Sequence, residues 1–242
     1  MKTLKKIIER QKDNHNPPVT VAFLGDSVTQ GCFEVYKKSE TTIETVFDKS
    51  AAYHRYFEMI FDVLCPKAPV NIINAGVSGS SAKAGLQRLD EFVISHKPDL
   101  TVVCFGLNDC KNGIEGISAY VDSLSAIFDA LTSAGSEIIF MTPNMMCCSI
   151  SPHITDAVTK EIAEMCMNNQ NEGMLDAYID AARALCKEKG IPVCDVYKKW
   201  KRMAECGIDV TELLANKINH PTREMNWLFA TSLLETIFDE GI

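Results

Sequence analysis

The stretch VTVAFLGDSVTQG, residues 19–31, decides the fold because an apolar run passes directly into a turn bounded by glycines. Its first six residues are apolar or β-branched, which is typical of a strand buried on both faces of a parallel sheet. Similar short runs recur at residues 70–73, 100–105, 137–141 and 191–196. These runs indicate a sheet of about five parallel strands.

Longer segments between these runs carry apolar residues at helical spacing; they cover residues 52–64, 82–96, 114–134, 154–189 and 222–238. The alternation of strands and helices predicts an α/β protein built as a three-layer α/β/α sandwich. We expect an irregular excursion at the polar residues 39–50 and a turn between helices at residues 168–173. No repeat or linker divides the chain, so residues 1–242 are expected to form one domain.

Composition excludes several classes of protein. The formal net charge of −8 argues against binding to a phosphate backbone. No apolar run is long enough to span a bilayer, and no long amphipathic segment has a basic face, so we expect no stable membrane association. The first 18 residues lack the apolar core of a signal peptide, which predicts a cytoplasmic protein. The ten cysteines show no CxxC spacing, so reduced thiols are expected and no structural zinc site.

Four short motifs stand where an open parallel sheet places its chemistry, beyond the carboxyl ends of the strands or just before the final helix. Ser27 lies in a tight turn after the first strand, where a hydroxyl can face a substrate. His220 has the side chain whose ordinary pKa suits it to take a proton near neutrality. A backbone N–H and the Asn108 amide are donors that a developing oxyanion needs. The motifs are GDSVTQG (25–31), NAGVSGSS (74–81), GLND (106–109) and NKINHP (216–221).

Together these motifs resemble the blocks of the SGNH hydrolases, also called GDSL esterases and lipases, in the order expected of that family. The resemblance runs from Val21 to the last predicted helix and implies a flavodoxin-like sandwich. It implies that Ser27 is the nucleophile and His220 the general base. It also implies an oxyanion hole made of the Ser27 N–H, the Gly79 N–H and the Asn108 side chain.

Each of these residues also has a simpler structural interpretation. Ser27 can cap the helix that follows it, Gly79 can serve only a turn, and Asn108 can satisfy backbone groups at a strand end. We expect Asp26 to support the turn by hydrogen bonds rather than to take part in chemistry. Four motifs in the family's order favour the catalytic interpretation of the other three residues.

One position departs from the family pattern. The family usually carries an aspartate three residues before the histidine, and this chain has Lys217 there. Three possibilities stay open: a Ser–His dyad whose imidazole is oriented by a backbone carbonyl or by Asn216, a carboxylate supplied from elsewhere such as Asp209 or Glu212, or a weakened enzyme. The dyad or the relocated partner is favoured because the other motif residues are present.

The predicted reaction is hydrolysis of a small acyl ester, such as an acetyl ester carried on a carbohydrate, through a Ser27 acyl-enzyme. No metal or organic cofactor is expected. The partner is a small-molecule ester, and the sequence predicts no oligomeric state. The alternatives are a binding protein with little or no turnover, and a lysophospholipase or thioesterase. A nucleotide-binding module is disfavoured because the phosphate loop is missing.

Overall fold

A five-stranded parallel sheet forms the centre of the computed structural model, which describes residues 1–241. The strand order is β4-β1-β5-β6-β7, the order of flavodoxin-like sheets. The paired strands run parallel throughout, which confirms the predicted α/β fold with about five parallel strands. The strands are β1 (Val19–Gly25), β4 (Val70–Gly76), β5 (Leu100–Cys104), β6 (Glu137–Met141) and β7 (Val193–Cys194).

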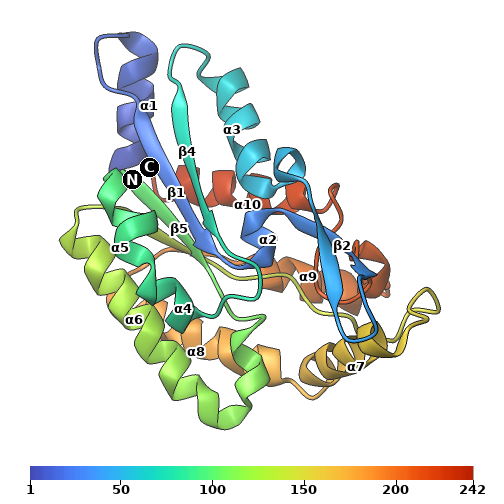
Figure 1. Ribbon diagram of the computed structural model, residues 1–242. Helices are drawn as coiled ribbons and strands as arrows, with labels where there is room; N and C mark the ends of the chain where they lie inside the picture. The colour runs from blue at the N-terminus through green and yellow to red at the C-terminus, as the bar shows by residue number, and fades with distance from the viewer. Residues whose placement is uncertain (242) are drawn as a thin grey trace.

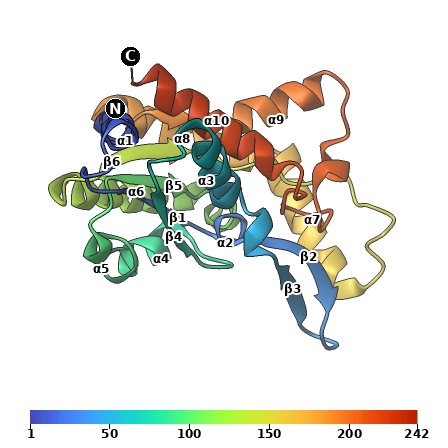
Figure 2. The ribbon, with the colours of Figure 1, turned by 90° about the horizontal axis from the view of Figure 1, so that it is seen from above.

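Helices cover both faces of this sheet, as Figures 1 and 2 show. On one face α3 packs against α10, and on the other α4, α6 and α8 pack in series. Right-handed crossovers between parallel strands produce this division. The helices are α1 (Lys2–Lys12), α2 (Ser27–Gln30), α3 (Tyr53–Leu64), α4 (Ala82–Gln87), α5 (Leu89–Phe92), α6 (Ile117–Ser133), α7 (Ala157–Asn171), α8 (Met174–Lys189), α9 (Val196–Glu205) and α10 (Asn226–Asp239).

Two predicted elements are shorter than expected. The helix predicted over residues 82–96 is interrupted at Arg88, whose guanidinium donates hydrogen bonds to the Gly25 carbonyl and the Ser80 hydroxyl. The strand predicted over residues 191–196 keeps only Val193–Cys194. Pro192 has no N–H to donate, and the side chain of Asp195 already caps α9 by accepting from the Lys198 N–H. The turn expected at residues 168–173 separates α7 from α8.

The irregular excursion predicted at residues 39–50 is wrong in part. Residues Ile43–Phe47 form β3, which pairs antiparallel with β2 (Cys32–Lys37). This hairpin extends away from the main sheet beside α7 (Figures 1 and 2). Its strand β3 is only partly buried, so it lacks the buried face that would mark a strand in the sequence.

The apolar core is continuous between the sheet and its helices. Eight of the ten cysteines are buried and all ten are unpaired, as expected of reduced thiols that pack as small hydrophobic residues. Within residues 1–241 no helix is both long and apolar enough to cross a bilayer. The same part of the chain contains no cluster of three or more His, Cys, Asp or Glu side chains suited to hold a metal ion.

Candidate active site

Ser27 occupies the sharp turn between β1 and α2. Asp26 caps α2, since its Oδ1 accepts a hydrogen bond from the Val28 N–H at 3.0 Å. The capping role therefore belongs to Asp26, and the Ser27 hydroxyl is free for another contact. Glycine is required at position 25, because a Cβ there would stand 2.9 Å from the Cys104 carbonyl and closer still to Thr29.

His220 reaches Ser27 from the loop before α10. Its Nε2 lies 3.0 Å from the Ser27 Oγ, and its Nδ1 lies 2.9 Å from the backbone carbonyl oxygen of Phe33. A carbonyl can only accept a hydrogen bond, so this contact places the proton on Nδ1 and leaves the Nε2 lone pair facing the hydroxyl. That tautomer is the one a general base for serine needs. Both side chains are buried, at 4% and 5% exposure.

The structure corrects two of the possibilities left open, Asn216 and Asp209, as orienters of the imidazole, because Nδ1 bonds the Phe33 carbonyl instead. Asn216 instead shapes the loop: its Oδ1 accepts the N–H groups of residues 218, 219 and 220 at 2.9–3.0 Å. Asp209 caps the 3-10 helix Val210–Leu213 by accepting from the Thr211 N–H. Glu212 pairs with Lys217 at 2.8 Å. Of the possibilities left open by the sequence, the geometry agrees with a backbone carbonyl.

The three expected oxyanion elements line one pocket of about 210 Å³ together with His220. Gly79 has φ +74°, a conformation that glycine adopts without strain, and the preceding Ser78 N–H is held by the Gln30 side chain at 2.7 Å. Within residues 1–241 the N–H groups of Ser27 and Gly79 donate to no acceptor. They are therefore available to a ligand.

The Asn108 amide is held from both sides. Its Nδ2 donates to the Ser80 carbonyl at 3.2 Å and to Asp26 Oδ2 at 3.4 Å, while its Oδ1 accepts from Lys111 Nζ at 3.0 Å. The contact with Asp26 is at the long limit for a hydrogen bond and is the weaker of the two that Nδ2 makes. The neighbouring Asp109 fixes the backbone around this loop, because its carboxylate accepts the N–H groups of Ala82 and Gly106.

Burial dominates the electrostatics of these residues. It raises the pKa of Asp26 to about 7 and that of Asp109 to about 6. Burial lowers the pKa of His220 to about 4, with a smaller lowering from the Lys111 cation and opposing contributions from the Phe33 carbonyl and Glu34. His220 is therefore neutral at physiological pH and able to accept a proton.

The remaining pocket wall comes from segments that carry no motif. The hairpin contributes Val35, Ile43 and Thr45, and α7 contributes Ile162 and Met165. Lys111 is the one charged side chain among the described lining residues. Sequence reasoning did not identify the wall residues of β3 and α7, because only the fold brings these two elements to the site.

Comparison with known proteins agrees with this architecture. The model of the GDSL-like lipase/acylhydrolase family matches residues 23–228. An arylesterase from Vibrio mimicus is 30% identical over 100 residues, which are 38% of this chain and 48% of that protein. An acetylxylan esterase from Geobacillus stearothermophilus is 28% identical over 87 residues, 36% of this chain and 38% of its own length. The chain thus spans about half or less of the curated relatives it matches.

Solved structures show the same fold across nearly the whole chain. A variant of an acetyl-xylooligosaccharide esterase from Geobacillus stearothermophilus superposes with a TM-score of 0.67 at 19% identity, covering 90% of this chain and 94% of that one. A lipase/acylhydrolase from Enterococcus faecalis gives 0.65 at 18% identity, with 92% and 96% covered. The family match covers most of the chain, and the chain therefore belongs to the GDSL-like lipase/acylhydrolase (SGNH) family.

Proposed function

We propose that this chain hydrolyses carboxylic esters of small acyl groups through an acyl-enzyme on Ser27. One observation carries the proposal: a single buried imidazole contacts the Ser27 hydroxyl through Nε2 and a backbone carbonyl through Nδ1. This arrangement holds the histidine in the tautomer that removes a serine proton.

The reaction follows from these contacts. His220 Nε2 takes the Ser27 proton as Oγ attacks the ester carbonyl, and the N–H groups of Ser27 and Gly79 receive the developing oxyanion. The protonated imidazole then gives its proton to the departing alcohol. Water, deprotonated by the same nitrogen, attacks the acyl-enzyme and releases the acid and the free serine.

The Asn108 side chain adds a third donor when one of its amide hydrogens is shared with the oxyanion. Its 3.4 Å contact with Asp26 is the weaker of its two donations, so that hydrogen is the one we assign to the reaction. The Ser80 carbonyl and Lys111 hold the planar amide in its orientation, so this hydrogen is shared between Asp26 and the oxyanion without a rotation of the side chain.

The substrate we propose is an acetyl ester, carried on a carbohydrate. A pocket of about 210 Å³ with an apolar wall suits a short acyl group, and the Geobacillus stearothermophilus matches named above act on acetylated xylan or xylooligosaccharide by their descriptions. Initial rates on p-nitrophenyl acetate, octanoate and palmitate, and on acetylated xylooligosaccharides, test this choice. A preference for the long esters would instead favour a lipase or lysophospholipase.

A binding protein without turnover is the second candidate. It is favoured by the fact that the Phe33 carbonyl, rather than a carboxylate, contacts His220 Nδ1. A fluorophosphonate probe separates the two, because it reacts only with an activated serine. We expect labelling of the wild-type chain and none of Ser27→Ala. Failure of the folded wild type both to label and to turn over any ester in the panel would refute hydrolysis.

A further inference from the structure

We propose that Arg223 is a positioning residue for the His220 base, acting through the hairpin segment that carries the Phe33 carbonyl. This inference rests on the proposed function. The carbonyl belongs to β2, in a two-stranded hairpin outside the main sheet. Such a hairpin is at best marginally stable by itself, so the position of its carbonyl depends on other contacts.

Arg223 makes three kinds of contact with the base of this hairpin. Its guanidinium carbon lies 4.4 Å from the centre of the Phe33 ring. Its Nη1 and Nη2 contact the two carboxylate oxygens of Glu34 at 2.6 and 3.1 Å. Its Nε donates to Asp48, directly after β3, at 3.0 Å. One planar side chain thus holds the strand that carries the carbonyl and the end of its partner strand.

The same arginine is connected to the imidazole along the chain, because Arg223 follows His220 by three residues. These contacts form a closed circuit, by which we mean a ring of linked residues. His220 Nδ1 bonds the Phe33 carbonyl, and Arg223 contacts the Phe33 ring and the Glu34 carboxylate. Three peptide bonds then connect Arg223 back to His220. The circuit fixes the separation between carbonyl and imidazole. It thereby positions the Phe33 carbonyl, a neutral acceptor, as side-chain packing positions the aspartate in other triads.

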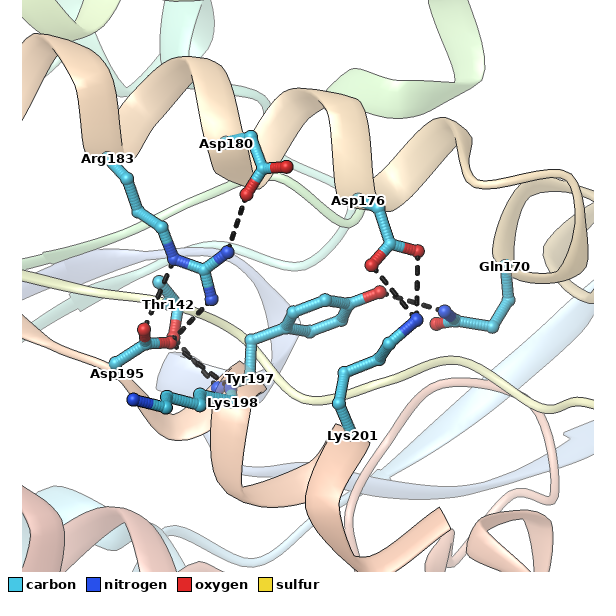
Figure 3. Close-up of polar contacts among 9 residues, drawn as sticks. All are labelled: Thr142, Gln170, Asp176, Asp180, Arg183, Asp195, Tyr197, Lys198 and Lys201. Atoms are coloured by element: carbon cyan, nitrogen blue, oxygen red, sulfur yellow. Dashed lines mark hydrogen bonds and ion pairs between the residues drawn. The ribbon is translucent and has the colours of Figure 1, made fainter. Parts of the chain in front are cut away.

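The chain offers a matched control in Arg183, shown in Figure 3. Arg183 joins α8 to the start of α9, bonding Asp195 through Nε at 3.2 Å and Nη2 at 2.8 Å and Asp180 through Nη1 at 2.7 Å. It also faces an aromatic ring, that of Tyr197, and the two arginines are similarly exposed, at 34% and 30%. None of these control residues lines the Ser27 pocket.

The experiment compares Arg223→Ala, Arg223→Lys and Arg183→Ala with the wild type. The first readout is the proton NMR signal of the His220 Nδ1–H, assigned by its loss in His220→Ala. A hydrogen bond to a buried carbonyl protects this proton from exchange. The second readout is the division of the effect between kcat and KM, with active sites counted by the fluorophosphonate probe.

We expect Arg223→Ala to lose the protected signal and to lower kcat roughly ten- to a hundredfold with little change in KM, because a displacement of about 1 Å costs this much. Lysine keeps the charge but lacks the planar fork, so Arg223→Lys should restore both readouts only in part. Arg183→Ala should keep the signal and kcat at wild-type values.

Two results would overturn the inference: a wild-type signal and kcat in Arg223→Ala, or the same losses in Arg183→Ala, which would indicate general loosening. If Arg223→Ala does not fold, Glu34→Gln replaces it. We then expect a smaller loss of the protected signal and of kcat, and an unchanged signal would contradict the proposal. A wild type that keeps the protected signal but turns over no ester refutes the proposed function, while the signal still tests Arg223.

Discussion

The serine turn and the histidine loop are built in different ways. In the turn, the contacts that shape the backbone come from within the motif, such as the Asp26 carboxylate on the Val28 N–H. In the loop, Asn216 shapes the backbone locally, but the imidazole is oriented by the Phe33 carbonyl, 187 residues away in the chain. Residue types in the sequence therefore specify the serine turn, whereas the orientation of the His220 imidazole depends on the fold.

The difference bears on what the missing aspartate costs. In serine proteases an asparagine in place of the triad aspartate lowers kcat about 10⁴-fold because its amide stabilises the wrong tautomer. A backbone carbonyl has no hydrogen to donate, so the Phe33 contact keeps the proton on Nδ1. What it lacks is the negative charge that stabilises an imidazolium, and the lowered pKa of His220 agrees with that lack.

Removing the proposed base gives the largest expected effect. His220→Ala should lower kcat on the order of 10⁴- to 10⁶-fold, as removal of the histidine does in other serine hydrolases, because the members of such a unit act together. His153, which is exposed and lines no part of the pocket, provides the control, and His153→Ala should keep full activity. Ester turnover within tenfold of wild type in folded His220→Ala would show that His220 is not catalytic.

Loss of the Asn108 amide comes next. Asn108→Ala should lower kcat roughly 10²- to 10³-fold with a small change in KM, because an oxyanion donor acts mainly in the transition state. Asn112, in the same loop, bonds the Asp109 carbonyl and lies outside the Ser27 pocket, so Asn112→Ala should keep kcat. Equal losses in both variants would mean that Asn108 only supports the loop.

The pH profile sharpens the contrast between a carbonyl and a carboxylate partner. The proposed base, His220, can take a proton only when neutral, and its folded pKa of about 4 keeps it neutral above that pH. kcat/KM should therefore hold down to pH 5 and halve near pH 4, whereas a histidine of ordinary pKa would lose about thirtyfold by pH 5. A half-point above pH 6 in the steady-state kcat/KM profile would contradict this expectation.

Stability must be followed in the same pH range, since two buried groups act in opposite directions. The lowered pKa of His220 withdraws stability as the pH falls below 6.5 toward 4. The raised pKa of Asp26 does the reverse: its contribution is present on the acid side and is lost as the pH rises from 3.8 through 7. Near-ultraviolet circular dichroism at each pH separates unfolding from protonation of the base.

Residue patterns predicted the sheet, most helices and the four motifs because each depends on local spacing: apolar runs, helical periodicity and glycine-bounded turns. They missed β3 because Ile43–Phe47 is only partly buried and shows no clear alternation. They did not identify Phe33 as the residue whose carbonyl accepts from His220 Nδ1, because every residue has a carbonyl and the residue type does not indicate which one is used. The pocket wall at Ile162 and Met165 likewise depends on where α7 lies in the fold.

Restoring the family's aspartate should have the smallest effect. The Lys217 ammonium is bonded to Glu212, and the residue has φ +58°, a left-handed conformation that aspartate and asparagine tolerate. A carboxylate at 217 would have to displace the Phe33 carbonyl from Nδ1, which it already holds at 2.9 Å. We expect Lys217→Asp to change kcat by less than about threefold, because the tautomer is already set.

Lys217→Asn is the matched control, since it suits the same backbone conformation without adding charge. Both variants lose an exposed ion pair worth at most about 1 kcal/mol, so their free energies of unfolding should stay close to that of wild type. The kcat of Lys217→Asp relative to Lys217→Asn then isolates the carboxylate. A kcat that rises more than about tenfold in the aspartate variant alone would show that His220 lacks a neighbouring negative charge rather than the correct tautomer.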